Sequence, residues 1–337
     1  MVRRPKDQAV SEKLPVARVA VDISLAHLDR PFDYLVPAAM DATAVPGCRV
    51  RVRFAGQLVD GYLLERVQTS EHEGRLARIE RVISPEPVLT EEIFGLARAV
   101  ADRYAGTLAD VLRLAIPPRH ATAEREAQRE IQGGPASGRG PGPSRPELRS
   151  WARYPAGEAF LTALAEGRPV RAAWSARPGP DWPDEIAIAA ATAAAAGRGV
   201  IIVVPDARDL DRVDQALAKL ESSGPGHVCL SADLGPAERY RRWLAVRRGL
   251  VQVVAGTRSA MFAPVADLGL VVLWDDGDDL HAEPRAPYPN AREVLALRAH
   301  RSGAAALIGG FTRTAELTQL VAGGWARPLA SDPADLR

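Results

Sequence analysis

Two different rhythms of hydrophobic and polar residues divide the chain. Between residues 16 and 118, short β-branched segments separated by turn signals predict strands at 17–23, 49–54, 57–66 and 75–83. Thr90, with Glu91 and Glu92 behind it, predicts a helix over 90–104. This part of the chain therefore predicts a small, mainly β domain, either a barrel or a sandwich.

Beyond residue 150 the pattern changes to continuous apolar segments that alternate with helical ones. Strands are predicted at 170–174, 199–204, 227–230, 250–255, 268–274 and 304–308. Helices are predicted at 184–196, 207–220, 236–248 and 290–300. Because strands that are apolar on both faces are typical of a parallel sheet covered by helices, this part predicts an α/β lobe. Ligands of such sheets bind at the carboxyl ends of the strands.

A segment poor in apolar residues separates the two parts. Eleven of the fourteen residues from Gly133 to Pro146 are Gly, Pro or Ser, a composition that buries too little apolar surface to order a chain. The predicted organisation is a flexible N-terminus at 1–15, a β domain at 16–118, a disordered linker at 119–150, an α/β lobe at 151–326, and a tail at 327–337 that could mark a truncation point.

Composition narrows the class of protein. The 337 residues are 47% hydrophobic, and 43 basic against 42 acidic residues leave a formal net charge of +1. This balance excludes general disorder and a uniformly basic nucleic-acid-binding surface. Two isolated cysteines predict neither a metal site nor a disulfide framework. No segment suits a signal peptide or a membrane helix, so we expect a cytoplasmic location without membrane contact.

The end of the first α/β strand lacks a phosphate-binding loop. A P-loop needs a glycine-rich turn followed by Gly-Lys-Ser/Thr. Residues 175–183 instead read SARPGPDWP, with three prolines and no lysine. The only lysine after the linker, Lys219, lies within a predicted helix. A Walker A motif is therefore excluded, and a GxGxxG dinucleotide fingerprint is absent as well.

Two later strand ends carry polar residues. The strand at 268–274 leads into an acidic segment that either holds Mg²⁺ or forms a turn capping the next element, and it comprises Asp275, Asp276, Gly277, Asp278 and Asp279. The strand at 250–255 leads into a group that could contact phosphates, and it comprises Gly256, Thr257, Arg258 and Ser259. Neither group identifies a function by itself.

In order and spacing, these motifs resemble the PriA family of replication-restart helicases. Residues 256–279, GTRSAMFAPVADLGLVVLWDDGDD, are similar to the family stretch from GTRSALFAP to DEEHD, and VIIVVPD at 200–206 is similar to an earlier family strand. The first half agrees in the order of ARVAV at 17–21, FDYLVP at 32–37, PGCRVRV at 46–52, EPVL at 86–89 and DRY at 102–104. The resemblance covers 16–118 and 151–326, and it implies a 3′-end-binding domain followed by a RecA-like lobe.

The resemblance further implies a pocket for the 3′ end of a nascent DNA strand, built around Phe32 and Asp33. The aromatic ring would stack on the terminal base, and the carboxylate would accept a hydrogen bond from the 3′-OH. Gly56 would let the sugar approach closely. Where the family often has a lysine, this chain has Ala77, so Arg78 or Arg75 is expected to replace it. From the residues alone, Phe32 and Asp33 also suit a core aromatic residue beside a turn aspartate.

Three arginines of one predicted strand form a second candidate for DNA contact. Arg49, Arg51 and Arg53 alternate with apolar residues, which places their guanidinium groups on one face of the strand. They form either a track for DNA phosphates or a merely solvated strand face.

The departures from the family pattern fall on the ATPase. The proline-rich turn replaces Walker A, DEEH becomes Asp275-Asp276-Gly277-Asp278, and residues 309–314 retain little of the family's Ser-Ala-Thr-Pro motif. We therefore expect a divergent member of the family with degenerate helicase motifs. In it Gly256, Thr257, Arg258 and Ser259 are a motif remnant, and Asp275 and Asp276 are a Walker B remnant. No catalytic or metal-binding residue is assigned.

The expected function is recognition of stalled or abandoned replication forks through the nascent 3′ end, with support of primosome assembly and helicase reloading but without ATP hydrolysis. Whether the chain is an enzyme stays open, because an ATP-dependent 3′–5′ helicase with atypical motifs and a non-catalytic interaction scaffold remain alternatives. No cofactor is expected in this chain. The family implies ATP and Mg²⁺ in active members and zinc in a C-terminal module beyond these residues. The expected partners are branched DNA, primosome proteins and single-strand-binding protein.

Overall fold

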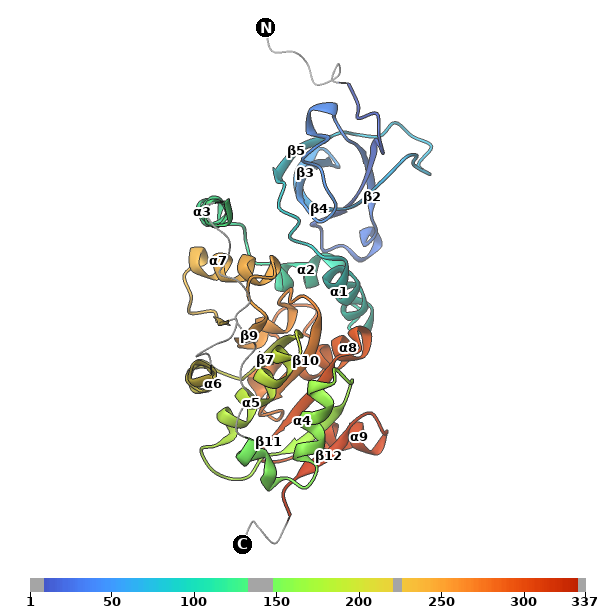
Figure 1. Ribbon diagram of the computed structural model, residues 1–337. Helices are drawn as coiled ribbons and strands as arrows, with labels where there is room; N and C mark the ends of the chain where they lie inside the picture. Colours follow the sequence, from blue (N-terminus) through green and yellow to red (C-terminus); the bar gives the residue numbers. More distant parts are fainter. Residues whose placement is uncertain (1–8, 133–147, 221–225, 333–337) are drawn as a thin grey trace. The chain divides into compact units, whose positions relative to one another are not determined.

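The chain folds into two compact units. The computed structural model describes residues 9–132, 148–220 and 226–332, and the units are Met1–Ile116 and Pro117–Arg337 (Figure 1). The first unit is mainly β and the second is α/β, so the predicted fold class is confirmed.

The first unit is built on a five-stranded antiparallel sheet that closes into a barrel. The sheet order is β2-β1-β4-β3-β5, where β1 is Val16–Val21, β2 Phe32–Leu35, β3 Arg49–Phe54, β4 Gln57–Val67 and β5 Ile79–Ser84. The amide of Leu35 donates to the carbonyl of Ala77 at 2.8 Å, which joins β2 to the segment before β5 (Figure 1). The sequence predicts four of these strands but not β2, because four residues are too few for a clear period of two.

Side-chain alternation fills the barrel, and two helices follow it. Val50 and Val52 are fully buried, whereas the arginines beside them on β3 lie at the surface. The predicted helix at 90–104 is present as α1, Glu91–Arg103, and a second helix, α2, spans Leu108–Ala115. Asp29 ties both helices to the barrel, because it pairs with Arg98 of α1 at 2.6 Å and accepts from the first amide of α2 at 2.9 Å.

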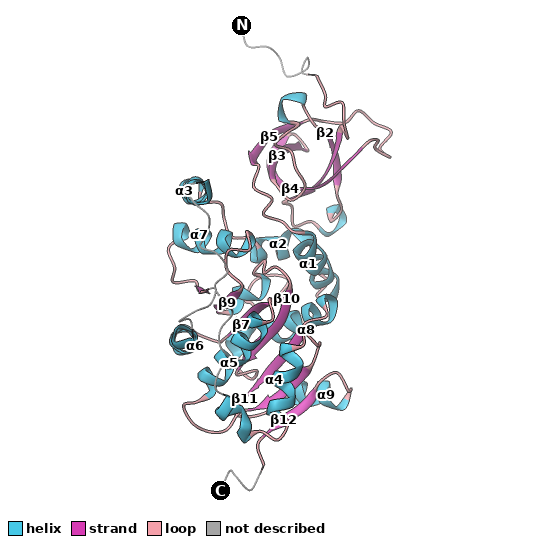
Figure 2. Cartoon of the chain, in the orientation of Figure 1, coloured by secondary structure: helices cyan, strands magenta, loops and turns pink. Residues whose placement is uncertain are grey.

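The second unit is a seven-stranded parallel sheet with the order β12-β6-β11-β10-β7-β9-β8. Its strands are β6 Arg171–Ser175, β7 Gly199–Val203, β8 His227–Leu230, β9 Val253–Gly256, β10 Leu268–Trp274, β11 Ala305–Gly310 and β12 Arg327–Ala330. Its helices include α4 Gly157–Ala165, α5 Trp182–Ala195, α6 Ala207–Leu220, α7 Pro236–Arg247, α8 Ala291–Ser302 and α9 Ala315–Ala322. Figure 2 shows the strands of this unit flanked by helices. All six predicted strands and all four predicted helices are present.

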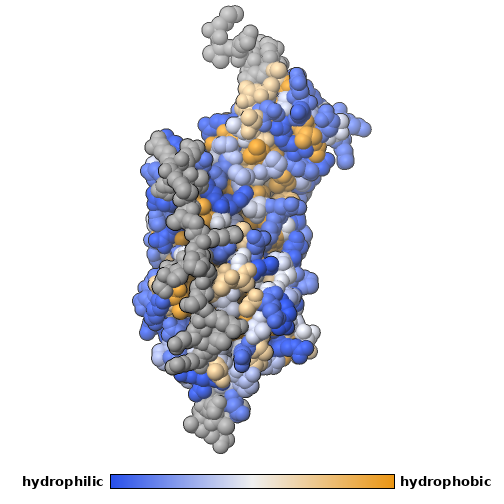
Figure 3. Space-filling model, in the orientation of Figure 1, coloured by the Kyte–Doolittle hydropathy of each residue, from blue (hydrophilic) through white to orange (hydrophobic). Residues whose placement is uncertain are grey.

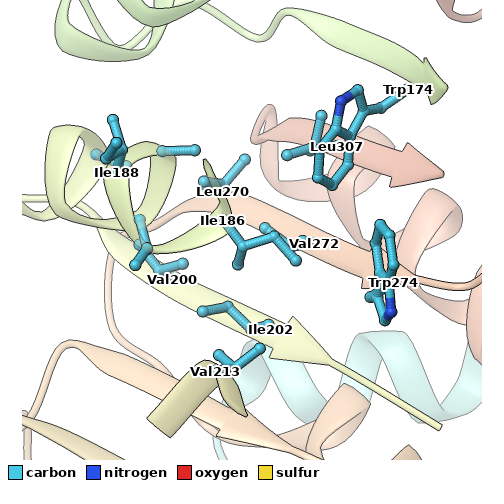
Figure 4. Close-up of a cluster of buried hydrophobic side chains, with 14 of the residues drawn as sticks. Trp174, Ile186, Ile188, Val200, Ile202, Val213, Leu270, Val272, Trp274 and Leu307 are labelled. Atoms are coloured by element: carbon cyan, nitrogen blue, oxygen red, sulfur yellow. The ribbon is translucent and has the colours of Figure 1, made fainter. Parts of the chain in front are cut away.

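Burial of the strands on both faces explains their continuous apolar sequences. Val200, Ile202 and Val272 pack against Ile186 of α5 in the cluster that Figure 4 shows. Val271, which alternates with its neighbours on β10, is fully buried on the opposite face of the sheet. The same figure shows Trp174 and Trp274 near the carboxyl ends of their strands.

The predicted linker at 119–150 is wrong in its first part, which forms helix α3, Ala121–Gln132. The charged sequence of this segment, which contains three alanines, does not by itself keep it helical. Instead, Tyr240 of α7 donates to Glu124 at 2.9 Å, and Arg241 pairs with Glu126 at 3.0 Å. The two partner residues lie 116 and 115 positions later in the chain, so local composition does not reveal these contacts.

Two terminal boundaries also differ from the prediction. The amide of Ser11 donates to the carbonyl of Val36 at 2.9 Å, so part of the predicted flexible N-terminus is attached to the barrel. Strand β12 lies in the predicted tail and extends the sheet beside β6. The last residues of the predicted linker begin a 3₁₀ helix, Leu148–Arg153. The remaining predictions of flexibility fall on residues 1–8, 133–147 and 333–337, which lie outside the described residues.

Polar residues dominate the face of the molecule that Figure 3 shows, and the apolar ones form small separate groups. The helices within residues 9–132, 148–220 and 226–332 include none that is both long and apolar enough to span a membrane.

Candidate functional site

The barrel unit contains a pocket of about 860 Å³. Its walls come from β1, β2, β3, β4, the β3–β4 turn and the segment between β4 and β5. They are lined by Arg18, Arg30, Pro31, Phe32, Asp33, Tyr34, Arg53, Phe54, Ala55, Glu65, Glu71, His72, Arg75, Leu76 and Ala77. Four guanidinium groups and three carboxylates share this lining, so the pocket is close to neutral. Its selectivity must therefore come from individual hydrogen bonds and stacking rather than from net charge.

Asp33 is held in place while one of its oxygens can still accept. Its side chain is 15% exposed, and the hydroxyl of Ser70 donates to Oδ2 at 2.5 Å. Arg18 lies 3.8 Å from Oδ1 and gives its shorter contact, 2.8 Å, to Glu65. An ionised carboxylate has about four lone-pair sites. Oδ1 can therefore accept a hydrogen bond from a ligand hydroxyl inside the pocket.

Phe32 lies at the rim between the core and the pocket. Its ring meets Phe54 edge-on, with centroids 4.8 Å apart, and the guanidinium of Arg30 lies over it at 4.9 Å. A base stacks on this ring only when Arg30 moves aside or becomes a second stacking surface itself. The position of the Phe32 ring is therefore compatible with both interpretations of the sequence. The ring packs on the core, and it offers a stacking surface to the pocket.

Two residues predicted for the pocket, Gly56 and Arg78, are not among its lining residues. Ala55 lines it in place of Gly56, and both residues have positive φ, +46° and +83°, in the tight turn between β3 and β4. Arg78 bridges to Leu35 in the backbone pairing that closes the barrel, and Arg75 reaches the pocket wall instead.

The three arginines of β3 share one face, as the alternation predicts, but each has a partner there. Arg49 donates to the hydroxyl of Tyr62 at 2.9 Å, Arg51 forms two hydrogen bonds with Asp60 at 2.6 and 3.0 Å, and Arg53 pairs with Glu80 at 3.2 Å. Arg53 also lines the pocket. The ion pairs of Arg51 and Arg53 are exposed and therefore weak, and Arg53 is the member of the three whose side chain lines the pocket.

Sequence reasoning misses Arg18, Arg30 and Tyr34 in this pocket. Burial raises the pKa of Tyr34 to about 12, so its hydroxyl stays protonated. Arg18 and Tyr34 lie within the family-like segments ARVAV and FDYLVP, and Arg30 lies two residues before Phe32, but the sequence assigns none of the three a role in the pocket. Position relative to Phe32 and Asp33 is the only signal that could have suggested them.

Aromatic side chains fill the carboxyl edge of the parallel sheet. Trp182, the first residue of α5, stacks on Trp274, the last residue of β10, with centroids 4.0 Å apart and an angle of 7°. Trp174 packs on Trp274 at 5.4 Å, and Phe311 meets it edge-on at 5.2 Å. Arg212 lies over the Trp182 ring at 4.7 Å. Since parallel sheets bind ligands at this edge, these rings occupy the expected ligand position.

The two adjacent carboxylates predicted as a Walker B remnant differ in environment. Asp276 is buried, and it accepts from Arg292 at 3.0 Å through Oδ1 and from the Thr314 hydroxyl through Oδ2. Asp275 has a φ of +52°, and burial together with the nearby charge of Asp278 raises its pKa. Asp276 therefore fastens β10 to the first turns of α8 and α9, which favours the acidic turn over a Mg²⁺ site.

The remnant at 256–259 has a similar internal role. A Cβ on Gly256 would lie 2.4 Å from the carbonyl of Leu230, so the close approach of β8 and β9 requires glycine. Arg258 pairs with Glu283 at 2.8 Å and donates to two carbonyls of residues 280–282. Thr257 and Ser259 flank it in the same turn, which ties the end of β9 to the segment after β10.

His281 is a buried residue of this edge that sequence reasoning does not assign. Its Nε2 lies 2.9 Å from the carbonyl of Trp274, so this nitrogen must carry the hydrogen, and Nδ1 has no partner. Burial lowers its pKa, which keeps the ring neutral.

Comparison with known proteins agrees with these two units. Residues 18–117 match the family model described as 3′DNA-binding domain (3′BD). With the parallel sheet that follows, the match defines the class as a protein that joins a 3′ DNA-binding domain to a parallel α/β lobe. The predicted resemblance is confirmed, and the chain belongs to the PriA family of replication restart proteins.

The relatives cover nearly all of this chain. It is 54% identical over 315 residues to the probable replication restart protein PriA of Mycobacterium tuberculosis and 54% identical over 310 residues to that of Mycobacterium leprae. These alignments cover 94% and 92% of this chain and 47% of each relative, so the chain spans about half the length of the curated relatives it matches. Among solved structures, the Pyrococcus furiosus Hef helicase domain matches with a TM-score of 0.38 and 14% identity, covering 57% of this chain and 39% of that one.

Proposed function

We propose that this chain recognises stalled or abandoned replication forks through the nascent 3′ DNA end and supports primosome assembly and helicase reloading. The observation that carries the proposal is the position of Asp33 in the barrel pocket, with Oδ2 held by Ser70 and Oδ1 able to accept a hydrogen bond. A terminal 3′-OH donates to such an oxygen, whereas a 3′-phosphate brings a second negative charge to it. The carboxylate thus distinguishes an extendable end from a blocked one.

The α/β lobe in this proposal is a scaffold without ATPase or helicase activity. Two observations support that role: the buried Trp182–Trp274 stack at the carboxyl edge, and the full use of both Asp276 oxygens by Arg292 and Thr314. Its partners in the proposal are primosome proteins and single-strand-binding protein, and the proposal assigns neither ATP nor Mg²⁺ to these residues.

The 3′-end pocket is tested by equilibrium binding of the 337-residue chain to fluorescent forks that differ only at the nascent end. We expect a 3′-phosphate to weaken binding about tenfold or more relative to a 3′-OH, because a hydrogen bond to a charged group is worth about 1.5–3 kcal/mol. Asp33→Asn should remove most of this discrimination. Asp60→Asn, which removes a surface carboxylate from the same unit, is the matched control and should retain it. Equal affinities of the wild-type chain for both ends would refute the pocket.

The loss of nucleotide use is tested by binding of Mg·ATP and Mg·ADP to the same chain in a calorimeter. We expect no saturable heat at millimolar nucleotide. Saturable binding that Asp275→Ala abolishes would instead support the alternative of an ATP-dependent helicase with atypical motifs.

A further inference from the structure

The α/β unit brings together three side chains of the types that bind transition metals. Asp214 comes from α6, and His227 and Cys229 come from β8, with one ligand atom of each within 4.8 Å of the others. His227 Nε2 and Cys229 Sγ lie 2.7 and 3.0 Å from the same oxygen, Asp214 Oδ1. Among the residues that the structure describes, this is the only group of three or more such side chains with compatible geometry.

The fold creates this group without a sequence motif. His227 and Cys229 are two positions apart on a strand, so their side chains point to the same side. Strand β8 is the edge of the sheet, and α6 lies directly before it in the chain. The carbonyl of Cys229 accepts from Arg242 of α7 at 3.0 Å, which holds the strand backbone, and the positive charge of Arg242 acts on both Asp214 and Cys229. The sequence predicts no metal site because it shows two isolated cysteines, whereas the fold supplies the nitrogen and oxygen ligands.

The ligand types and spacing suit Zn²⁺. Zinc binds thiolate sulfur at about 2.3 Å and imidazole nitrogen and carboxylate oxygen at about 2.0–2.2 Å in a tetrahedron, which sets neighbouring ligand atoms roughly 3.3–3.7 Å apart. The separations from Asp214 Oδ1, 2.7 and 3.0 Å, are hydrogen-bond distances and lie below that range, so the three side chains must move apart by about half an ångström to admit the metal. Thiolate and imidazole are poor ligands for Mg²⁺ and Ca²⁺, which prefer oxygen. The Asp214 side chain is 52% exposed, so water can complete the coordination, while that of His227 is only 9% exposed.

We propose that Asp214, His227 and Cys229 form a zinc site that fastens helix α6 to the edge strand β8, with water as the fourth ligand. On binding, the Cys229 thiol loses one proton to solvent, and His227 gives up the hydrogen on Nε2 and carries its ring hydrogen on Nδ1, as a neutral ligating imidazole does. The two hydrogen bonds to Asp214 Oδ1 are thereby replaced by bonds to the metal. The site is structural, and it is independent of DNA binding by the barrel and of any nucleotide.

Co²⁺ is the direct probe, because thiolate ligation gives a charge-transfer absorption and tetrahedral coordination gives strong visible bands. The chain has only two cysteines, and Cys48 is fully buried in the barrel core, so the signal reports Cys229 alone. We expect one Co²⁺ per chain, full displacement by Zn²⁺, and a rise in the melting temperature of the α/β unit with Zn²⁺. Cys229→Ser should abolish the charge-transfer band. His227→Gln should weaken metal binding by about a hundredfold, since loss of even an outer-shell partner costs about 10–100-fold.

Cys48→Ala is the matched control and should leave metal binding unchanged. Absence of a stoichiometric Co²⁺ spectrum in the reduced wild-type chain would overturn the proposal, and so would a band that survives in Cys229→Ser. In that case the three side chains form a hydrogen-bonded group only. Neither result affects the 3′-end pocket, which is tested by DNA binding.

Discussion

The barrel pocket and the carboxyl edge of the parallel sheet are both places where a protein of this class can bind a ligand. They differ in how many of their polar atoms can still accept or donate. In the pocket, Asp33 keeps an accepting oxygen next to a cavity of about 860 Å³. At the sheet edge, Asp276 uses both oxygens inside the protein, and Trp182 and Trp274 are 1% and 2% exposed.

The difference lies in whether the polar and aromatic groups of the site are already occupied by contacts inside the protein. The two acidic residues after β10 still follow a strand, where a helicase-type lobe would place its metal-binding carboxylates. Arg292 of α8 now supplies the positive charge next to Asp276, and the tryptophan stack supplies the volume. At this edge, charge and volume are therefore both supplied from within the protein. Mutations separate such structural residues from those that can still contact a ligand.

The largest effect is expected from Trp274→Ala. It removes a buried ring that packs on Trp174, Trp182 and Phe311, and a large-to-small change of this kind costs about 3–5 kcal/mol. All six tryptophans lie beyond residue 150, so denaturation followed by tryptophan fluorescence reports the α/β unit alone. Trp325→Ala is the control, because this ring is only half-buried and stacks with Arg171. Equal losses for the two variants would contradict a special role for the stack.

Adjacent carboxylates at the sheet edge should respond with opposite signs. Asp276→Asn breaks a buried pair and leaves Arg292 without its strongest partner, which costs about 3–5 kcal/mol of unfolding free energy. Asp275→Asn should preserve or raise stability at neutral pH, because burial and Asp278 disfavour the charged form, and asparagine tolerates a positive φ. Denaturation at pH 7 measures both. Asp33→Asn in the pocket should leave this unfolding curve unchanged and should instead alter DNA binding. A change in the unfolding curve would contradict the distinction between the pocket and the sheet edge.

A pH effect separates the sheet edge from the pocket as well. Burial raises the pKa of Glu185 to about 7 from the ordinary 4.5, and Tyr154 donates to it at 3.1 Å. Between pH 4.5 and 7 the folded state therefore binds more protons than the unfolded state. The stabilisation is fully present below pH 4.5 and is lost as the pH rises through 7. At 1.36 kcal/mol per pKa unit, the loss of unfolding free energy reaches up to about 3 kcal/mol. Melting of the α/β unit against pH measures this slope. Glu185→Gln should flatten it, whereas Asp184→Asn on the exposed side of the same helix should not.

Most of the fold is predictable because its elements depend on local patterns. Strands β6 to β11 are continuous apolar segments, and α1 begins at a threonine cap whose hydroxyl accepts from the amide of Ile93. Elements held by distant partners are missed. Helix α3 depends on Tyr240 and Arg241, and β12 contains a proline and only four residues beside β6.

The candidate site is predictable only where a motif marks it. Phe32 and Asp33 follow from the resemblance, which also offers Arg75 as an alternative to Arg78, whereas the resemblance assigns no pocket role to Arg18 and Arg30. The stack of Trp182 on Trp274 joins residues far apart in sequence, and neither residue reveals the other. The sequence shows that the lysine of a phosphate-binding loop is absent. Only the fold shows which side chains occupy the carboxyl edge of the sheet.

The smallest effect is expected for two arginines of β3. They differ in whether the side chain lines the pocket. Arg53 lines the pocket and Arg51 does not, although both have an acidic neighbour, Glu80 at 3.2 Å and Asp60 at 2.6 Å. Loss of either exposed pair should cost only about 0.2–1 kcal/mol of stability. Fork binding measured across a series of salt concentrations should separate them. Arg53→Ala should reduce the slope of log affinity against log salt by about 0.7–0.9, the value of one phosphate contact, and Arg51→Ala should leave the slope unchanged. Equal reductions of the slope by the two variants would instead support phosphate contacts along the whole of β3. Both arginines would then leave their carboxylate partners to contact DNA.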